Sequence, residues 1–187
     1  MKKSRIRVLG AAAVIGAALT TTSASGAMAA TGPPADTTVT FTVTNGDLTI
    51  SAPSGVALIP AGSDSDSGLP GSTVAATMGD TVVTDNRAAL LTPWIATVSE
   101  TDFTTGTATL PETISAGDAG YDPGTVAKTG DITATGNSVT LSNDAQQVVT
   151  DAGSGDNTAT WDATITLAIP ATAIVGDYTG TLTSSVG

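Results

Sequence analysis

The sequence predicts an all-β protein, an antiparallel β-sandwich that follows a cleaved signal peptide. Short runs rich in β-branched residues alternate apolar and polar side chains, and Gly, Pro, Asn and Asp separate these runs at intervals of about ten residues. No apolar stripe recurs at the ~3.6-residue period of an amphipathic helix. An unfolded Thr/Ser/Gly stalk is the alternative, but such a stalk would not keep the alternation in phase.

Residues 1–29 have the layout of a secretory signal peptide. Four basic residues precede a twelve-residue apolar run over 8–19, and a small-residue site ends at Ala29, where we expect cleavage. This run is too short to cross ~30 Å of hydrocarbon at ~1.5 Å per residue. We therefore expect a secreted, extracellular protein with no membrane span after cleavage, made of a short linker (30–36) and a single domain (37–187).

The chain that remains after cleavage is strongly acidic. Only Arg87 and Lys128 stand against 17 acidic residues, which gives residues 30–187 a formal charge of −15. Binding to phosphates needs a surface of lysine and arginine, so nucleic acid is excluded as a partner. Simple attraction to anionic lipid head groups is excluded for the same reason.

A hairpin is expected at the start of the domain. Residues 37–44 alternate threonine with apolar side chains, and Asn45-Gly46 is typical of a two-residue type I′ turn. Residues 48–50 continue the alternation on the far side of that turn. The apolar face of the first strand consists of Val39, Phe41 and Val43.

Further strands are expected where apolar runs stand between turn residues. One short piece covers 56–59 and is closed by Pro60. Two stretches rich in Gly, Ser and Asp, 61–73 and 151–157, are expected to be exposed loops. The remaining strands are predicted at 81–84, 93–99, 111–115, 124–127, 138–142 and 146–149.

The clearest alternation lies at the C-terminal end. In 161–169 the apolar side chains share one face, and in 178–186 a second such face follows a turn across 170–176. We expect these two strands to be neighbours in one sheet.

The composition argues against enzymatic activity. The sequence has no His and no Cys, so nucleophilic triads and zinc sites built on these residues are excluded. A pair of carboxylates could hydrolyse a glycosidic bond, and Glu100, Asp102 and Glu112 are the candidates. A sugar site also needs aromatic platforms, and several of the six aromatic residues are in phase with core faces. We expect neither an enzyme nor an organic cofactor.

Asp64 and Asp66 resemble the start of a calcium-binding loop. An EF-hand requires glycine at the sixth position and glutamate at the twelfth, but Leu69 and Ala75 stand there. We expect an ordinary exposed loop, and weak calcium binding by clustered carboxylates is left open.

Arg87 and Trp94 form an unusual pair in a chain with so few basic and aromatic residues. Asp85-Asn86-Arg87 is expected to leave a strand in a turn, and Trp94 to begin the return strand. Arg87 can pair with Asp85 or stack on the Trp94 ring, and either contact would clamp the connection to the core.

Two segments carry a resemblance to a known family. Residues 82–103 contain an Asp-x-Arg turn, a tryptophan and a later phenylalanine. Residues 165–170, followed by 176–183, form the second segment, which ends in a strand-like alternation. This arrangement is similar to the WxL surface domains of Gram-positive bacteria, which carry a first and a final Trp-x-Leu. The resemblance implies an Ig-like or WxL-like sandwich that attaches non-covalently to the cell wall, with peptidoglycan as the ligand.

The sequence departs from the family pattern at both motifs. Ala96 stands where the first motif has leucine, and Ser184 and Val186 stand where the second has tryptophan and leucine. The missing aromatic at Ser184 leaves space that Trp161 is expected to fill. The candidate binding residues implied by the resemblance, which are also in phase with core faces, are Asp85, Arg87, Trp94, Ile95, Ala96, Ser184 and Val186.

These observations lead to three hypotheses of function. The first is a secreted, non-enzymatic surface protein that binds cell-wall polymer or another surface protein. The second is an assembly subunit that forms homo-oligomers or fibres by strand pairing, because edge strands of a sandwich can accept a further strand. The third is a glycoside-active enzyme that uses the three carboxylates named above.

Overall fold

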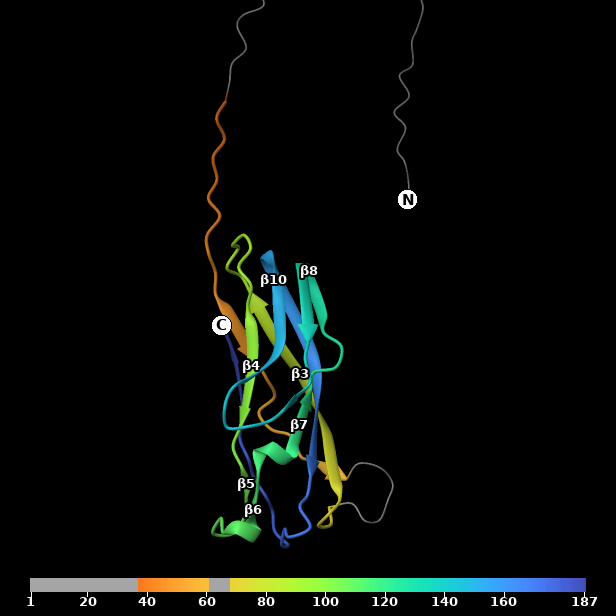
Figure 1. Cartoon of the computed structure of the whole chain (residues 1–187). Helices are drawn as coiled ribbons and strands as arrows, with labels where there is room; N and C mark the ends of the chain where they lie inside the picture. The colour runs from red at the N-terminus through yellow and green to blue at the C-terminus, as the bar shows by residue number, and fades with distance from the viewer. Residues whose placement is uncertain (1–36, 61–67) are drawn as a thin grey trace, which may run out of the picture. The chain divides into compact units, whose positions relative to one another are not determined.

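The computed structural model describes residues 37–60 and 68–187, so the predicted signal peptide (1–29) and linker (30–36) lie outside the described residues. Phe41–Gly187 forms one compact unit. Every strand pair in the described part of the chain is antiparallel, which confirms the predicted all-β sandwich (Figure 1).

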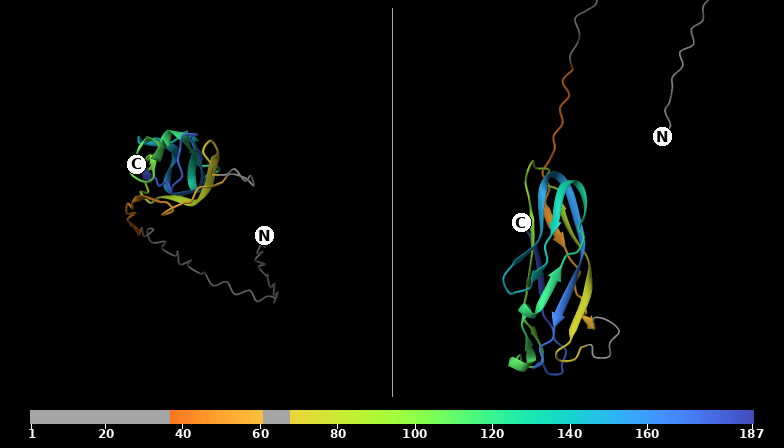
Figure 2. Two further views of the ribbon diagram at one scale, coloured as in Figure 1. Left: turned by 90° about the horizontal axis from the view of Figure 1, so that it is seen from below. Right: turned by 45° about the vertical axis from the view of Figure 1, so that its right-hand side comes forward.

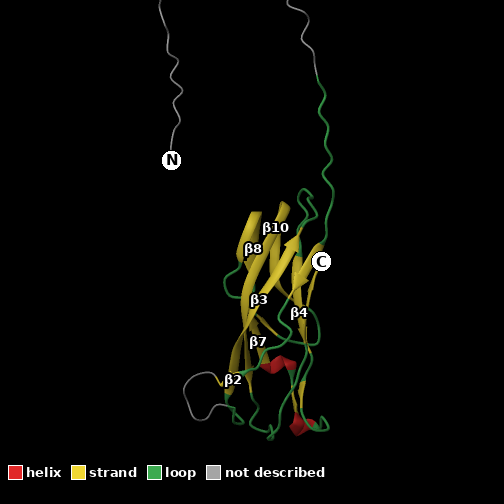
Figure 3. Ribbon diagram, turned by 180° about the vertical axis from the view of Figure 1, so that it is seen from behind, coloured by secondary structure: helices red, strands yellow, loops and turns green. Residues whose placement is uncertain are grey.

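Helical structure in the described residues consists of two single 3₁₀ turns, Leu110–Glu112 and Ala116–Asp118 (Figure 3). The strands, in chain order, are β1 (Leu48–Ser51), β2 (Ile59–Pro60), β3 (Thr73–Asp85), β4 (Ile95–Glu100), β5 (Phe103–Thr104), β6 (Thr113–Ile114), β7 (Ala119–Asp122), β8 (Ala127–Gly136), β9 (Val139–Thr140), β10 (Gln146–Ala168) and β11 (Leu182–Val186).

The 23-residue strand β10 connects the two halves of the sandwich. Along one edge it pairs first with β4, through residues 146–150, and then with β3, through residues 157–168. Along the other edge it pairs with β8 and then with β7. A single strand therefore belongs to both layers.

The strands close into a ring with one gap. β3, β10, β7 and β9 follow one another as hydrogen-bonded neighbours. The chain after β9 reaches β4, because the Glu100 N–H donates to the carbonyl of Ser142 at 2.9 Å. β4 pairs with β11 and β3 pairs with β1. The gap is a break in the hydrogen-bond ladder between β11 and β1, and the two strands lie side by side there, with Cα atoms within 8 Å of each other. Figure 2 shows the strands end-on around the core.

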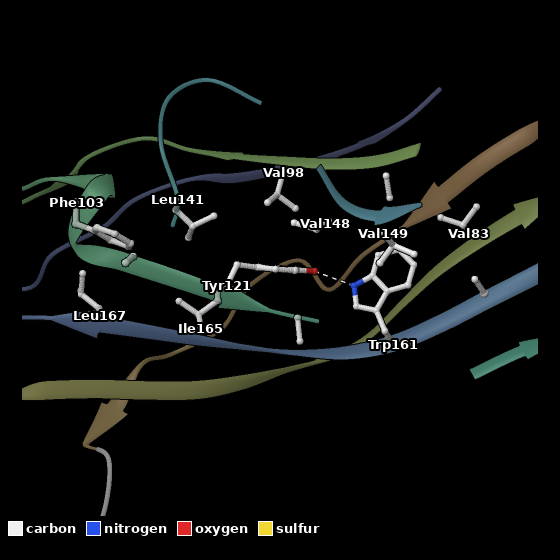
Figure 4. Packing of buried hydrophobic residues seen from close by; sticks show 14 of the residues in the cluster. Val83, Val98, Phe103, Tyr121, Leu141, Val148, Val149, Trp161, Ile165 and Leu167 are labelled. Carbon is white, nitrogen blue, oxygen red and sulfur yellow. Dashed lines mark hydrogen bonds between the residues drawn. The ribbon is translucent and has the colours of Figure 1, made fainter. Parts of the chain in front are cut away.

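The core fills the centre of this ring. Trp161, Ala163, Ile165 and Leu167 of β10 are all buried, which confirms the predicted alternation. The indole N–H of Trp161 donates to the hydroxyl of Tyr121 at 2.8 Å, so both polar groups are satisfied within the core (Figure 4).

The predicted N-terminal hairpin is wrong. Residues 37–47 form no strand, and the side chains of Val39, Phe41 and Val43 are 83%, 87% and 70% exposed. Asn45-Gly46 does not turn the chain back on itself. The Gly46 N–H donates to the carbonyl of Asn86, and the Asn86 N–H donates to the carbonyl of Asp47. These bonds extend the β1–β3 ladder to residues 46 and 47, so the chain continues into β1 without a hairpin.

The loop predicted at 151–157 is also wrong, because these residues belong to β10. Its glycines serve close packing instead: a Cβ at Gly153 would lie 2.5 Å from the Ile132 side chain and 2.6 Å from the Asp131 carbonyl. Gly155 has a φ of +76° within a register shift.

The predicted pairing of the last two alternating segments is wrong as well. β11 pairs with β4, and not with β10. The connection after β10 is too long for a tight hairpin, and part of it is held elsewhere by the bridge between Thr104 and Thr179.

Other predicted strands are shifted or shortened. Residues 111–115 contain part of a 3₁₀ turn, where Pro111 sits in the first turn, followed by β6. Residues 124–126 precede β8 and only Ala127 belongs to it. The remaining predictions coincide with β2, β3, β4, β9 and β10 at least in part.

Candidate functional site

Arg87 is held by an ion pair at the end of β3. Its Nε donates to Oδ1 of Asp85 at 2.9 Å and its Nη2 to Oδ2 at 2.8 Å. Nη2 also donates to the carbonyl of Thr92 at 3.1 Å. The guanidinium holds the pKa of Asp85 below its usual value. The sequence predicted that Arg87 either pairs with Asp85 or stacks on the Trp94 ring, and the structure shows the pairing with Asp85.

The other residues of the resemblance pack around this clamp. Trp94 and Ala96 are fully buried, and the indole N–H of Trp94 donates to the buried Asn157 at 3.2 Å. The two resembling segments are neighbours, since β4 pairs with β11 and places Ala96 opposite Val186. Burial of Trp94 and Ala96 gives them a role in the core. Ile95, at 37% exposure, is the most accessible residue of the first motif.

Asp151 lies buried near the clamp. It is 5% exposed, and neither carboxylate oxygen has a hydrogen-bond partner among the described residues. Burial, together with the nearby charge of Asp85, raises the pKa of Asp151. The described residues contain no cluster of three or more His, Cys, Asp or Glu side chains that could hold a metal. Asp64 and Asp66, the predicted calcium ligands, lie outside the described residues.

The described residues also enclose an apolar cavity of about 1040 Å³ on the side of the gap. Strands β3 and β10 form its floor through residues such as Met78 and Leu167. Residues 50–58 form one side, and residues 173–184 form the other. Ser184 is among the lining residues but Trp161 is not, so the expectation that Trp161 fills this space is wrong.

Glu100 stands in the wall of this cavity. The residue is 3% exposed, and its Oε1 has no hydrogen-bond partner among the described residues. Burial raises the pKa of Glu100 to about 7. A Cβ at Gly180 would lie 2.5 Å from this Oε1 and 2.8 Å from the ring of Phe103, so the glycine allows the chain to pass close to the carboxyl.

The other two candidate carboxylates are engaged in local structure. Oδ1 of Asp102 accepts from the N–H of Ala116 at 2.9 Å. Oε2 of Glu112 accepts from Thr109 and Thr107, and the bonds from Thr109 lower the pKa of Glu112. Glu100 differs from both because its Oε1 is unpartnered among the described residues.

Comparisons of the chain with protein-family models, with curated proteins and with solved structures gave no match. The resemblance to WxL domains therefore stays a prediction. The described residues include no helix that is both long and apolar enough to cross a membrane. Neither the gap nor the cavity was predicted from the sequence, because both depend on which strands end up as neighbours.

Proposed function

We propose that the protein is a secreted, non-enzymatic surface protein that assembles with other protein chains through the apolar cavity between residues 50–58 and 173–184. This develops the surface-protein hypothesis. The observation that carries the proposal is the cavity itself, which has a volume of about 1040 Å³ and a floor of apolar side chains from β3 and β10.

The lining of the cavity suits an apolar segment of another protein chain. Val74, Met78 and Leu167 are among the apolar residues that line it. Apolar side chains of a partner would leave water when they enter this space, which favours association. Such a contact needs no carbohydrate ligand.

Sedimentation velocity across a range of concentrations, combined with hydrogen exchange, tests this proposal. We expect association that grows with concentration and slower exchange of the amides of residues 52–58 and 173–182, which surround the cavity, in the associated state. A monomer at every concentration, with no change in the exchange of these amides, would contradict the proposal. Pelleting with purified peptidoglycan sacculi, with and without calcium, tests the wall-polymer hypothesis on the same preparation.

A further inference from the structure

We propose that the cavity binds uncharged apolar groups and that this binding takes up a proton on the carboxyl of Glu100. The inference rests on the proposed function and names the chemistry and the regulation of the same site. It combines three features: an apolar cavity, a buried carboxyl in its wall and a sequence without histidine or cysteine.

The fold fixes the carboxyl of Glu100 in the cavity wall. Glu100 ends β4, where it pairs with Leu182 of β11, and its N–H donates to the carbonyl of Ser142 at 2.9 Å. Phe103 and Gly180 line the cavity beside it. The residue is 3% exposed, and its Oε1 has no hydrogen-bond partner among the described residues. The backbone therefore holds Glu100 in place without bonding to this oxygen.

The surroundings of Glu100 offer no charge that would stabilise a carboxylate. Burial raises the pKa of Glu100 to about 7, and no neighbouring charge adds to this effect. The floor strands β3 and β10 contribute only apolar residues to the lining, and no lysine or arginine is among the described residues that line the cavity. The titratable side chains on the adjoining segments are bonded elsewhere or exposed: Asp102, Asp144, Asp177 and Tyr178.

An uncharged occupant distinguishes between the two forms of this carboxyl. Water that enters an unoccupied cavity of this size solvates a carboxylate. An apolar group displaces that water and offers no hydrogen-bond donor in its place, so the charged form loses far more free energy than the neutral acid. The occupant therefore binds the protonated chain more tightly, and binding is linked to the uptake of a proton.

A second copy of the chain supplies no base that could replace the proton. Arg87 and Lys128 are the only basic residues after the predicted cleavage site. Arg87 is bound to Asp85, and Lys128 lies in β8 and donates to the carbonyl of Ile132. In an assembly of identical copies, both basic side chains are thus engaged within their own domain, and a proton is left to neutralise Glu100.

The composition leaves the neutral pH range clear for this effect. Side chains other than histidine and cysteine ordinarily titrate below about pH 5 or above about pH 9. Burial also raises the pKa of Asp151, but Asp151 lies near the Arg87 clamp and is not among the residues that line the cavity. Single substitutions of Glu100 and Asp151 therefore separate the two buried acids.

Binding of diphenylhexatriene to the full chain tests the inference. This probe is an uncharged hydrocarbon whose fluorescence rises in apolar surroundings. We expect its affinity to fall about 30-fold from pH 6 to pH 8.5, because the apparent affinity follows the fraction of chains in the protonated form. Glu100→Gln is always neutral and should bind the probe equally well at both pH values. Asp151→Asn is the matched control: it changes the other buried acid with an unpartnered carboxylate, and should keep the full pH dependence.

Each outcome decides the inference. The inference fails if the unmodified chain does not bind the probe at pH 6, if it binds equally at both pH values, or if the pH dependence persists in Glu100→Gln. Probe binding does not require self-association, so the two proposals fail separately. A chain that is monomeric at every concentration but binds the probe with this pH dependence supports the inference and contradicts the proposed function. Self-association of equal strength at both pH values supports the proposed function and contradicts the inference.

Discussion

Arg87 shows how a single side chain can organise a connection. The residue lies in the link from β3 to β4, and its guanidinium joins the carboxylate of Asp85 to the carbonyl of Thr92. Asp85 is 2% exposed, so its charge has little contact with water and depends on this partner. Arginine suits the position because its planar guanidinium donates to both carboxylate oxygens at once.

We predict that Arg87→Ala lowers the free energy of unfolding by about 2–4 kcal/mol, since a buried carboxylate would lose its partner. Urea unfolding at neutral pH measures this change. The matched control is Lys128→Ala, which removes the other basic residue of the domain at an exposed position, where the ammonium donates to the carbonyl of Ile132, and should change stability by less than about 1 kcal/mol. Equal effects of the two substitutions would mean that net charge, and not the buried pair, determines the loss.

Glu100 gives the fold a dependence on pH. Burial raises its pKa from 4.5 to about 7. Below pH 4.5 the folded and unfolded chains both hold this proton, so it does not affect stability. Between pH 4.5 and about 7, Glu100 ionises more readily in the unfolded chain than in the folded one. Glu100 therefore destabilises the fold increasingly as the pH rises, by up to about 3 kcal/mol at higher pH.

We therefore predict that Glu100→Gln stabilises the protein above pH 7 and has little effect below pH 4.5. Thermal unfolding from pH 4 to pH 8 checks this prediction. Glu112→Gln is the control, because the pKa of Glu112 is lowered and its loss should destabilise the fold at neutral pH. A stability gain for Glu100→Gln of the same size at every pH would show that ionisation is not the cause.

At the scale of the element, β10 determines the architecture, because it pairs with four other strands. Its central portion must pass close to β8, and Gly153 makes this approach feasible. Any side chain at that position would meet backbone as well as the Ile132 side chain.

We predict that Gly153→Ala destabilises the protein by about 1–3 kcal/mol, the usual cost of overpacking. Gly55→Ala is the matched control, since a Cβ at Gly55 would meet nothing within 4 Å. Differential scanning calorimetry of both variants tests the pair. A melting temperature for Gly153→Ala equal to that of Gly55→Ala would show that β8 and β10 can move apart at little cost.

The elements differ in how well the sequence predicted them. Where alternation was strong and the side chains face the core, as in 161–168, the prediction was confirmed. The segment 37–44 alternates just as strongly but forms no strand, because a strand needs a partner as well as a pattern. The stretch 151–157 has the composition of a loop, yet its glycines serve close strand packing.

At the scale of the whole molecule, the sequence predicted the fold class and the ion pair of Arg87 but not the candidate site. The gap exists because β11 pairs with β4 instead of β10. That choice is made by contacts between residues far apart in the chain, such as Thr104 and Thr179. Local patterns carry no information on such a pairing, so the cavity lined by Ser184 could not be foreseen.

The charge of the whole molecule leads to a prediction about salt. Copies that each carry −15 after the predicted cleavage repel one another over about 30 Å at ~0.01 M salt, but over only about 8 Å at ~0.15 M. We expect self-association to strengthen severalfold across this range, because salt screens the repulsion between the acidic copies while the apolar part of the proposed contact is unaffected by screening. Sedimentation equilibrium at the two salt concentrations measures this effect. Weaker association at the higher concentration would instead indicate contacts between opposite charges.

The positions of Arg87 and Lys128 also affect how the protein meets proteases. They are the only basic residues after Arg7, so they are the only points beyond it where a trypsin-like enzyme can cut. At the first, the backbone N–H and the guanidinium are both bound to Asp85. At the second, the chain lies in β8 and pairs with β10. Because such an enzyme needs a locally unfolded substrate, the folded domain offers it no ready cleavage site.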